Sequence, residues 1–319
     1  MRLLLTGASG FFGRNVVERL DRLRRDQGDG FVDLDLHLTA RRAASDGRSG
    51  TTIHQVDLLD HDATAELVRT IRPTHLCHLA WVGPEHTDRY RTPENHRWAE
   101  ASIALFRAFR AAGGKRLVHL GSCIEYGNQA SGARVETQPL APDTAYGEAK
   151  VAVADEVDRL TADLSAAVAR VFFAYGPHEQ PERLVPSLIL ALEAGEPIEL
   201  TEGRQRRDYL DARDVAAAIT ILSARPDAVG PFNVGSGQAP AVRTIATRLG
   251  EVAGRPDLLR FGARPEGADT AAEIVADLGR ITEAVGWRPT ISLDDGLADA
   301  TRWWRLRTTD GVSNGGNDS

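Results

Sequence analysis

Short apolar runs alternate with amphipathic segments through the first 175 residues of the chain. The runs have the length of buried strands, and they cover residues 2–6, 32–40, 53–58, 75–80, 116–122 and 166–173. The segments between them show helical spacing at about 12–24, 62–71, 95–112 and 144–163. Strands that alternate with helices form right-handed βαβ units. The pattern therefore predicts an α/β fold with a doubly wound parallel sheet.

The regular alternation ends near Tyr175, and shorter elements separated by Pro and Gly follow. We expect residues 1–175 to form the sheet domain and residues 176–307 to form mainly a smaller C-terminal lobe. Part of the segment 206–235 is expected to return to the first domain. Residues 308–319 are polar, contain Gly and Ser and offer no apolar anchor, so we expect a mobile tail there.

Composition and charge exclude several classes of protein. The net charge of −7 argues against a general nucleic-acid binder, which needs an excess of basic residues. No apolar run reaches the ~18 residues that a membrane span requires. The two cysteines, Cys77 and Cys123, form no disulfide framework, which favours a reducing cytoplasm. Only two of the 38 basic residues are lysines, Lys115 and Lys150, so each is a candidate for a role that arginine cannot fill.

The segment TGASGFFG places three glycines between the first strand and the first helix. Glycines at these positions allow a tight turn and bring backbone N–H groups and a helix N-terminus close to a pyrophosphate. The segment therefore predicts a dinucleotide site of the Rossmann type. The residues that we expect to contact the cofactor there are Gly7, Ser9, Gly10, Phe11, Phe12 and Gly13.

The end of the second strand indicates which dinucleotide binds. NAD sites usually offer an acidic residue there to the ribose hydroxyls, whereas this strand ends in LTARR. Two guanidinium groups, of Arg41 and Arg42, suit a 2′-phosphate, so NADP(H) is favoured over NAD. Asp57 and Leu58, which end the third strand, are expected beside the adenine.

The segment YGEAK places Tyr146 and Lys150 one helical turn apart on one helix face. A tyrosine with an ordinary pKa near 10 is a poor acid–base catalyst at neutral pH. A neighbouring ammonium group favours the phenolate and lowers that pKa. The pair therefore predicts a catalytic proton donor.

With these motifs the chain resembles the extended short-chain dehydrogenases/reductases, in the group that acts on nucleotide sugars. The resemblance covers nearly the whole length, from TGASGFFG through HLA (78–80), GSCIEYG (121–127), YGP (175–177) and NVGSG (233–237) to GWRP (286–289). It implies a catalytic group of Ser122, Tyr146 and Lys150 and a homodimer formed through the helices near 95–112 and 144–163. It also implies cofactor contacts from Leu79 and Ala80 and a diphosphate held by Arg207 and Arg264. We further expect nucleotide-sugar contacts from Trp81, which follows the HLA strand end, and from Cys123, His178 and Asn233.

Departures from the family pattern reduce the number of reactions that the chain could catalyse. Sugar 4,6-dehydratases of the family carry Thr-Asp-Glu where this chain has Ser122, Cys123 and Ile124. An isoleucine cannot carry a proton, so dehydration is disfavoured. If the strand continues past Ser122, alternation turns Cys123 and Glu125 to the face opposite Ser122.

Two further departures concern single positions. Trp98 stands, by an ungapped count, where the family has an asparagine that supports the catalytic lysine, and Asn95 or His96 lies one turn away. Reductive epimerases of the family pair a cysteine with a histidine after Tyr-Gly-Pro, but Cys123 and His178 are out of register for that pairing. His75 and Cys77 point away from His78 on a strand, so we expect no metal site.

We therefore expect a cytoplasmic, NADP(H)-dependent enzyme that reduces a keto group, at C4, on a nucleotide-linked deoxysugar. Tyr146 would donate the proton, Ser122 would polarise the carbonyl, and Lys150 would bind the cofactor ribose and tune Tyr146. The main alternative is an NAD-dependent nucleotide-sugar 4-epimerase, which uses the same three residues. A reductive epimerase and a non-catalytic nucleotide sensor are weaker alternatives.

Overall fold

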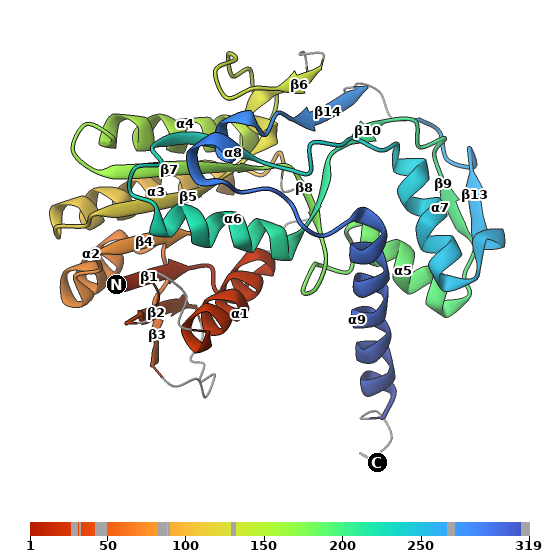
Figure 1. The fold of residues 1–319 in the computed structure, drawn as a ribbon, viewed down its shortest axis with the longest axis horizontal. Helices are drawn as coiled ribbons and strands as arrows, with labels where there is room; N and C mark the ends of the chain where they lie inside the picture. The colour runs from red at the N-terminus through yellow and green to blue at the C-terminus, as the bar shows by residue number, and fades with distance from the viewer. Residues whose placement is uncertain are drawn as a thin grey trace.

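A parallel sheet of seven strands forms the centre of the protein (Figure 1), in the order β12-β7-β5-β4-β1-β2-β3. The structure, a computed structural model, describes residues 1–26, 31, 33–41, 50–81, 88, 90–128, 132–266 and 272–313. The strands of this sheet are β1 (Arg2–Thr6), β2 (Asp35–Ala40), β3 (Thr51–Gln55), β4 (His75–His78), β5 (Arg116–Ser122), β7 (Ser165–Val171) and β12 (Gly230–Val234). The strand order reverses between β1 and β4, and ligands of such sheets bind at the carboxyl ends of the strands beside that reversal. The predicted α/β fold with a doubly wound parallel sheet is confirmed.

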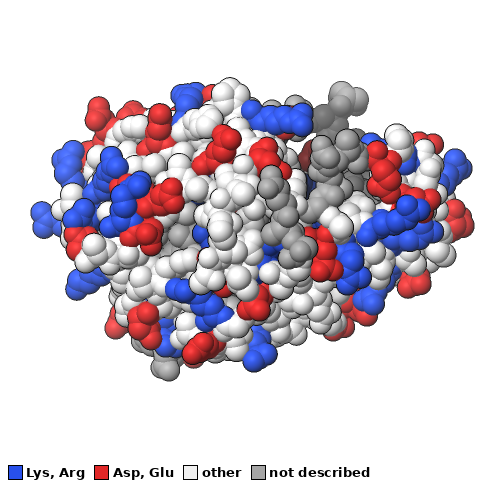
Figure 2. All heavy atoms as spheres, turned by 90° about the horizontal axis from the view of Figure 1, so that it is seen from above, with Lys and Arg blue, Asp and Glu red and all other residues white. Residues whose placement is uncertain are grey.

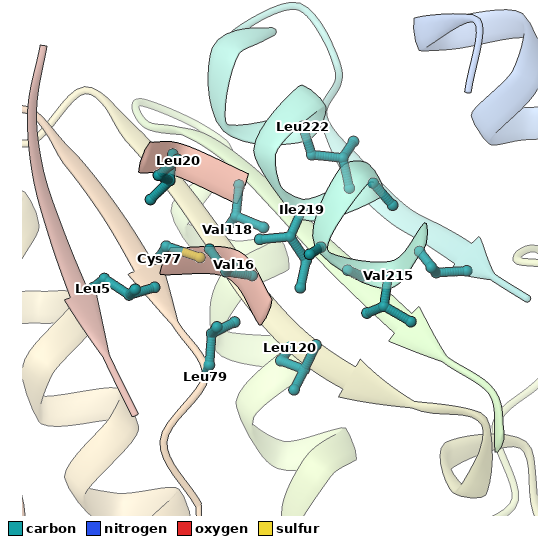
Figure 3. Packing of buried hydrophobic residues seen from close by; sticks show 14 of the residues in the cluster. Leu5, Val16, Leu20, Cys77, Leu79, Val118, Leu120, Val215, Ile219 and Leu222 are labelled. Atoms are coloured by element: carbon teal, nitrogen blue, oxygen red, sulfur yellow. The ribbon is translucent and has the colours of Figure 1, made fainter. Parts of the chain in front are cut away.

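Helices cover both faces of the sheet because its central strands are apolar at consecutive positions. Leu3 and Leu5 of β1 point to one face and Leu4 to the other, and all three are buried. The helices on the first face are α1 (Phe11–Arg25), α6 (Ala212–Ala224) and α8 (Gly279–Val285), and those on the second are α2 (His61–Ile71), α3 (Glu94–Ala111) and α4 (Ala145–Leu160). Figure 3 shows Val16 of α1 and Ile219 of α6 against the strands on the first face.

A smaller lobe lies beside the sheet (Figure 1), where α5 (Leu184–Ala194), α7 (Val242–Ala253) and α9 (Leu293–Ser313) share a separate apolar core. Three short parallel sheets lie outside the central one. They are β8 (Phe173–Tyr175) with β11 (Tyr209–Asp211), the three strands β10 (Arg206–Arg207), β14 (Glu273–Ala276) and β6 (Ala133–Arg134), and, within the lobe, β9 (Ile198–Leu200) with β13 (Leu259–Phe261). Two 3-10 turns, η1 (Cys123–Tyr126) and η2 (Pro256–Leu258), complete the described elements.

Two predicted strands differ most from the structure. The one predicted at 53–58 is β3, which begins at Thr51 and ends at Gln55. The strand predicted at 166–173 is two strands, because the N–H of Phe172 donates to Val234 of the main sheet while that of Phe173 donates to Asp208. α9 continues to Ser313 and residues 314–319 lie outside the described residues, so the mobile tail predicted at 308–319 stays a prediction. Extending an existing helix by a residue is far easier than starting one, which explains why polar residues continue α9.

The described surface carries charges of both signs, and the two cysteines lie in the interior. On the face in Figure 2 acidic and basic side chains alternate over both ends of the molecule, and its described residues form no continuous basic surface. Within the described ranges, no helix is both long and apolar enough to cross a membrane. Cys77 and Cys123 are buried free thiols.

Candidate active site

The loop after β1 forms a cradle that glycine alone can line. Gly7 has a φ of 75°, and a Cβ added there would lie 2.6 Å from the backbone N of Ala80. A Cβ on Gly13 would lie 2.0 Å from the Gly7 carbonyl oxygen. These positions let α1 and the end of β4 approach the loop closely. No described side chain caps the N-terminus of α1 at Gly10, and its first turn carries no acidic residue, so its N–H groups are suited to an anion.

The other predicted cofactor positions lie on the same edge of the sheet. Leu79 and Ala80 follow β4, and the N–H of Leu79 donates to Thr6 at the end of β1. Asp57 and Leu58 follow β3, where Asp57 accepts a hydrogen bond from the N–H of Leu59 and Leu58 packs with Ala80. Ser9, Phe11 and Phe12 surround the start of α1 and are exposed or half-buried. The residues present therefore fit a dinucleotide across the strand reversal.

The end of β2 carries the predicted phosphate contacts. Arg41 directly follows the strand and is exposed. Arg42 lies outside the described residues. Thr39 and Ala40, the last two residues of β2, are not acidic.

Ser122, Tyr146 and Lys150 come from two elements that meet in the sheet domain. Ser122 is the last residue of β5, and its Oγ accepts a hydrogen bond from the N–H of Ile124 at 3.3 Å. Tyr146 and Lys150 lie on the first turns of α4. A Cβ on Gly147 would lie 3.1 Å from the Ile124 carbonyl oxygen, so this glycine allows α4 to approach the turn after Ser122. The predicted catalytic residues are thus held on adjoining elements.

Lys150 is enclosed although it carries an ammonium group. It is 2% exposed, its Nζ donates to the Leu120 carbonyl at 2.8 Å, and Nζ lies 5.8 Å from the centre of the Tyr146 ring. Burial lowers the pKa of Lys150, and the charge of Glu125 partly opposes this shift. Such an ammonium beside a phenol favours proton transfer by the phenol near neutral pH.

Three aromatic and polar residues complete this environment, and only one of them was predicted as a site residue. Trp81 follows β4 and lies edge-to-face with Tyr146, with ring centres 6.1 Å apart. Tyr90 contacts the Tyr146 ring in the same way, at 5.7 Å. Asn95 accepts a hydrogen bond from Trp81 Nε1 at 2.9 Å. Trp98, at the position counted for the family asparagine, packs in an apolar cluster instead. Asn95, one turn earlier, is the polar residue directed to this region.

The strand argument applied to Glu125 is wrong, because the chain leaves the β conformation directly after Ser122 and forms η1. Glu125 is fully buried, and its carboxylate accepts from the N–H of Ser122 and from Arg170 Nε, both at 2.7 Å. This arrangement is a capping box that ends β5 and begins the turn. The spacing of Ser122 and Glu125 was the sequence signal that could have identified it.

Two predicted substrate contacts have their polar groups enclosed by the protein. Cys123 is 4% exposed in an apolar cluster, and burial raises the pKa of its thiol to about 12. Asn233 is fully buried, where its Oδ1 accepts from the Tyr126 hydroxyl and its Nδ2 donates to the Arg134 carbonyl. The Asn233 side chain thus joins β12 to β6, and both of its polar groups are bonded within the protein, so the structure offers no support for its predicted substrate contact.

His178 is not brought to the catalytic group either. Its Nε2 lies 2.9 Å from Glu18 of α1, and its ring contacts Trp303 of α9 at 5.0 Å. Arg207, in β10, is 8% exposed, with its guanidinium 5.7 Å from the Phe173 ring. Arg264 is exposed after β13. Arg207 thus lies in the small sheet of β10, β14 and β6, and Arg264 lies in the lobe after β13, and their predicted diphosphate contacts stay predictions.

The described residues contain no group of three or more His, Cys, Asp or Glu side chains that could hold a metal ion. His78 lies between Thr6 and Ser102, at 2.7 and 2.9 Å from their hydroxyl oxygens. Burial lowers the pKa of His78 to about 3, so it is neutral at physiological pH.

Comparison with known proteins agrees with this geometry. Residues 3–235 match the NAD dependent epimerase/dehydratase family. A UDP-glucose 4-epimerase from Mycolicibacterium smegmatis is 28% identical over 97% of this chain and 100% of its own. A dTDP-glucose 4,6-dehydratase from Neisseria gonorrhoeae is 27% identical over 95% of each chain. The solved structure of MoeE5 in complex with UDP-glucuronic acid and NAD has a TM-score of 0.81 and 27% identity, covering 96% of this chain and 100% of that one.

The family match spans the glycine loop, the predicted catalytic residues and the return of the chain to the sheet at β12. The curated relatives match over nearly their whole lengths, so the similarity includes the smaller lobe. The chain therefore belongs to the NAD dependent epimerase/dehydratase family of enzymes.

Proposed function

We propose that the protein reduces the C4 keto group of a nucleotide-linked deoxysugar, with NADP(H) as the hydride source. The observation that carries this proposal is the pair of residues after Ser122. Cys123 is a buried thiol with a raised pKa, and Ile124 has no titratable group, so neither supplies the proton carriers that dehydration requires. Ser122, Tyr146 and Lys150, which suffice for reduction, are all present.

The chain's own residues would divide the chemistry as follows. A bound nicotinamide dinucleotide supplies a hydride to the carbonyl carbon. Tyr146 donates its phenolic proton to the carbonyl oxygen as negative charge develops there, and the Ser122 hydroxyl donates a hydrogen bond to the same oxygen. The Lys150 ammonium favours the phenolate that Tyr146 becomes. The product is an alcohol, and Tyr146 regains a proton from solvent.

The loss of NADPH or NADH absorbance at 340 nm on addition of a keto sugar nucleotide tests this function. A panel of 4-keto-6-deoxy sugar nucleotides is incubated with NADPH or NADH, and we expect one NADPH consumed per sugar reduced. Turnover of a sugar nucleotide without net change in cofactor, together with tightly bound NAD, would support the epimerase instead. Cofactor binding with no turnover of any sugar nucleotide would support a nucleotide sensor.

The cofactor preference predicts the effect of changing Arg41. Arg41→Ser is expected to raise the KM for NADPH about tenfold, because a hydrogen bond to a charged group contributes roughly 1.5–3 kcal/mol. The KM for NADH should stay the same, since NADH has no 2′-phosphate. Arg69→Ser is the matched control, because Arg69 is also exposed but lies near the end of α2, away from the carboxyl ends of the strands. Equal increases in the KM for NADPH and the KM for NADH in Arg41→Ser would contradict the predicted preference for NADP(H).

An NAD-dependent 4-epimerase is the second candidate, supported by the UDP-glucose 4-epimerase relative and by the NAD in the MoeE5 structure. A reductive epimerase is not proposed, because Cys123 is enclosed and the ring of His178 bonds Glu18.

The homodimer through α3 and α4 and the cytoplasmic location stay predictions. So do the division into domains at residue 175 and the substrate contacts of Arg207 and Arg264.

A further inference from the structure

The Lys150 ammonium lies against the face of an indole ring. Its Nζ is 3.7 Å from the centre of the Trp81 ring, well within the ~6 Å at which a cation is attracted to an aromatic face. On another side Nζ donates to the Leu120 carbonyl. Lysine has four rotatable bonds and a compact, mobile head, so a buried lysine needs such contacts to keep one position.

The Trp81 ring is itself held in one orientation. Its Nε1 donates to Asn95 Oδ1 at 2.9 Å, and Asn95 Nδ2 donates to the Thr92 carbonyl at 3.0 Å. Asn95 is fully buried on the first turn of α3. Rotating the indole would leave the buried Asn95 oxygen without this donor, and that loss is unfavourable.

The remaining groups around Lys150 do not hold it by charge at close range. His119 of β5 is fully buried beside His78, with ring centres 5.6 Å apart. Burial and the charge of Lys150 lower the pKa values of His119 and His78, so both rings are neutral. Glu125 is the acidic group whose charge acts on Lys150, and its carboxylate is bonded to Ser122 and Arg170. Tyr146 is the remaining titratable neighbour.

We propose that Trp81 is a positioning residue for Lys150, and that Asn95 fixes the indole ring in rotation. The ring confines the ammonium between the Leu120 carbonyl and Tyr146, and it keeps water from the Nζ atom. Trp81 and Asn95 thereby supply the support that an asparagine at position 98 would give in the wider family. The proposal rests on the proposed function only in that Tyr146 and Lys150 carry the proton transfer.

Nuclear magnetic resonance of lysine tests the placement without any substrate. Protein labelled with ¹³C at lysine Cε gives two lysine signals, from Lys150 and from the exposed Lys115, which is the internal control. We expect the Cε protons of Lys150 to be shifted upfield by the ring current of Trp81. Trp81→Leu should abolish this shift and Asn95→Leu should reduce it, while the Lys115 signal stays in place. An upfield shift that survives in Trp81→Leu would overturn the proposal.

The titration of the same signal tests the exclusion of water. Burial lowers the lysine pKa, so Lys150 should lose its proton below the ordinary value of about 10.4. In Trp81→Leu water reaches Nζ, and the midpoint should move upward towards that value. An unchanged midpoint would contradict the proposal. If Trp81→Leu does not fold, Trp81→Phe replaces it, since phenylalanine keeps an aromatic ring but lacks the N–H group. The upfield shift of the Lys150 signal in Trp81→Phe is expected to match that in Asn95→Leu.

Steady-state kinetics then show whether Trp81 positions Lys150 or contacts the substrate. Trp81→Leu is expected to lower kcat roughly tenfold or more with little change in the KM for the sugar nucleotide, because a misplaced catalytic group affects mainly the transition state. The double variant with Asn95→Leu should be no slower than Trp81→Leu alone, since Asn95 acts through Trp81. The loss of activity at high pH should shift upward together with the titration of Lys150, because its ammonium group keeps the proton to higher pH once water reaches Nζ. A raised KM with unchanged kcat, or additive losses, would identify Trp81 as a substrate contact instead.

Failure of the proposed function would be visible separately. If the wild type consumes no NADPH with any keto sugar nucleotide, the reductase proposal fails, and the lysine signals still decide the placement of Lys150. If it acts as an epimerase, the same double-variant comparison applies to that reaction, because it uses the same tyrosine and lysine.

Discussion

Tyr146→Phe is expected to lower kcat for ketone reduction about a thousandfold, because general acid catalysis contributes about 10²- to 10⁴-fold. The phenylalanine keeps the edge-to-face contacts of the ring with Trp81 and Tyr90 and removes only the proton donor. The Kd for NADPH and the KM for the sugar nucleotide should therefore change little. Initial rates at 340 nm, together with cofactor binding measured by fluorescence, check these values.

Tyr90→Phe is the matched control for this prediction. Tyr90 lies 5.7 Å from the Tyr146 ring and its carbonyl accepts a hydrogen bond from the Tyr146 N–H, so both variants perturb the same aromatic group. We expect kcat of Tyr90→Phe to stay close to the wild-type value. If Tyr90→Phe lost as much activity as Tyr146→Phe, the loss would follow from disturbed packing rather than from a missing proton donor.

Features that depend on local pattern were predicted well. The strand at 116–122 has the predicted bounds, because its apolar residues Leu117, Val118 and Leu120 stand between the glycines at 113–114 and the turn that follows Ser122. The glycine loop and the Tyr146–Lys150 pair also follow from spacing along the chain, since one helical turn or one tight turn fixes their relative positions.

Features that depend on contacts between distant segments were not predictable in this way. Trp81 and Asn95 are separated by 14 positions, and Lys150 is far from both in sequence. Their approach depends on how α3 and α4 pack on the sheet, which no periodicity of the sequence specifies. Glu125 shows a different cause of error, because the period of two that assigns faces holds only while the chain stays extended.

The buried pair of Glu125 and Arg170 predicts the largest effect on stability. Glu125→Leu is expected to lower the free energy of unfolding by roughly 3–5 kcal/mol, because breaking a buried pair leaves an uncompensated charge. The Arg170 side chain is 6% exposed, and it would keep only its bonds to the Tyr126 hydroxyl and the Glu136 carbonyl. The N–H of Ser122 would also lose its acceptor. Urea unfolding followed by circular dichroism measures the change.

Three further variants show whether charge burial is the cause. The double change Glu125→Leu with Arg170→Met should be more stable than Glu125→Leu alone, because no charge is left unpaired. Glu156→Leu should cost at most about 1 kcal/mol, since its partners Arg107 and Arg159 are exposed and screened by water. Glu125→Gln keeps an acceptor for the Ser122 N–H, so it should stay active. A folded Glu125→Gln protein without activity would show that Glu125 transfers a proton. If Glu125→Leu lowered the free energy of unfolding no more than Glu156→Leu does, the buried pair would not stabilise the turn after Ser122.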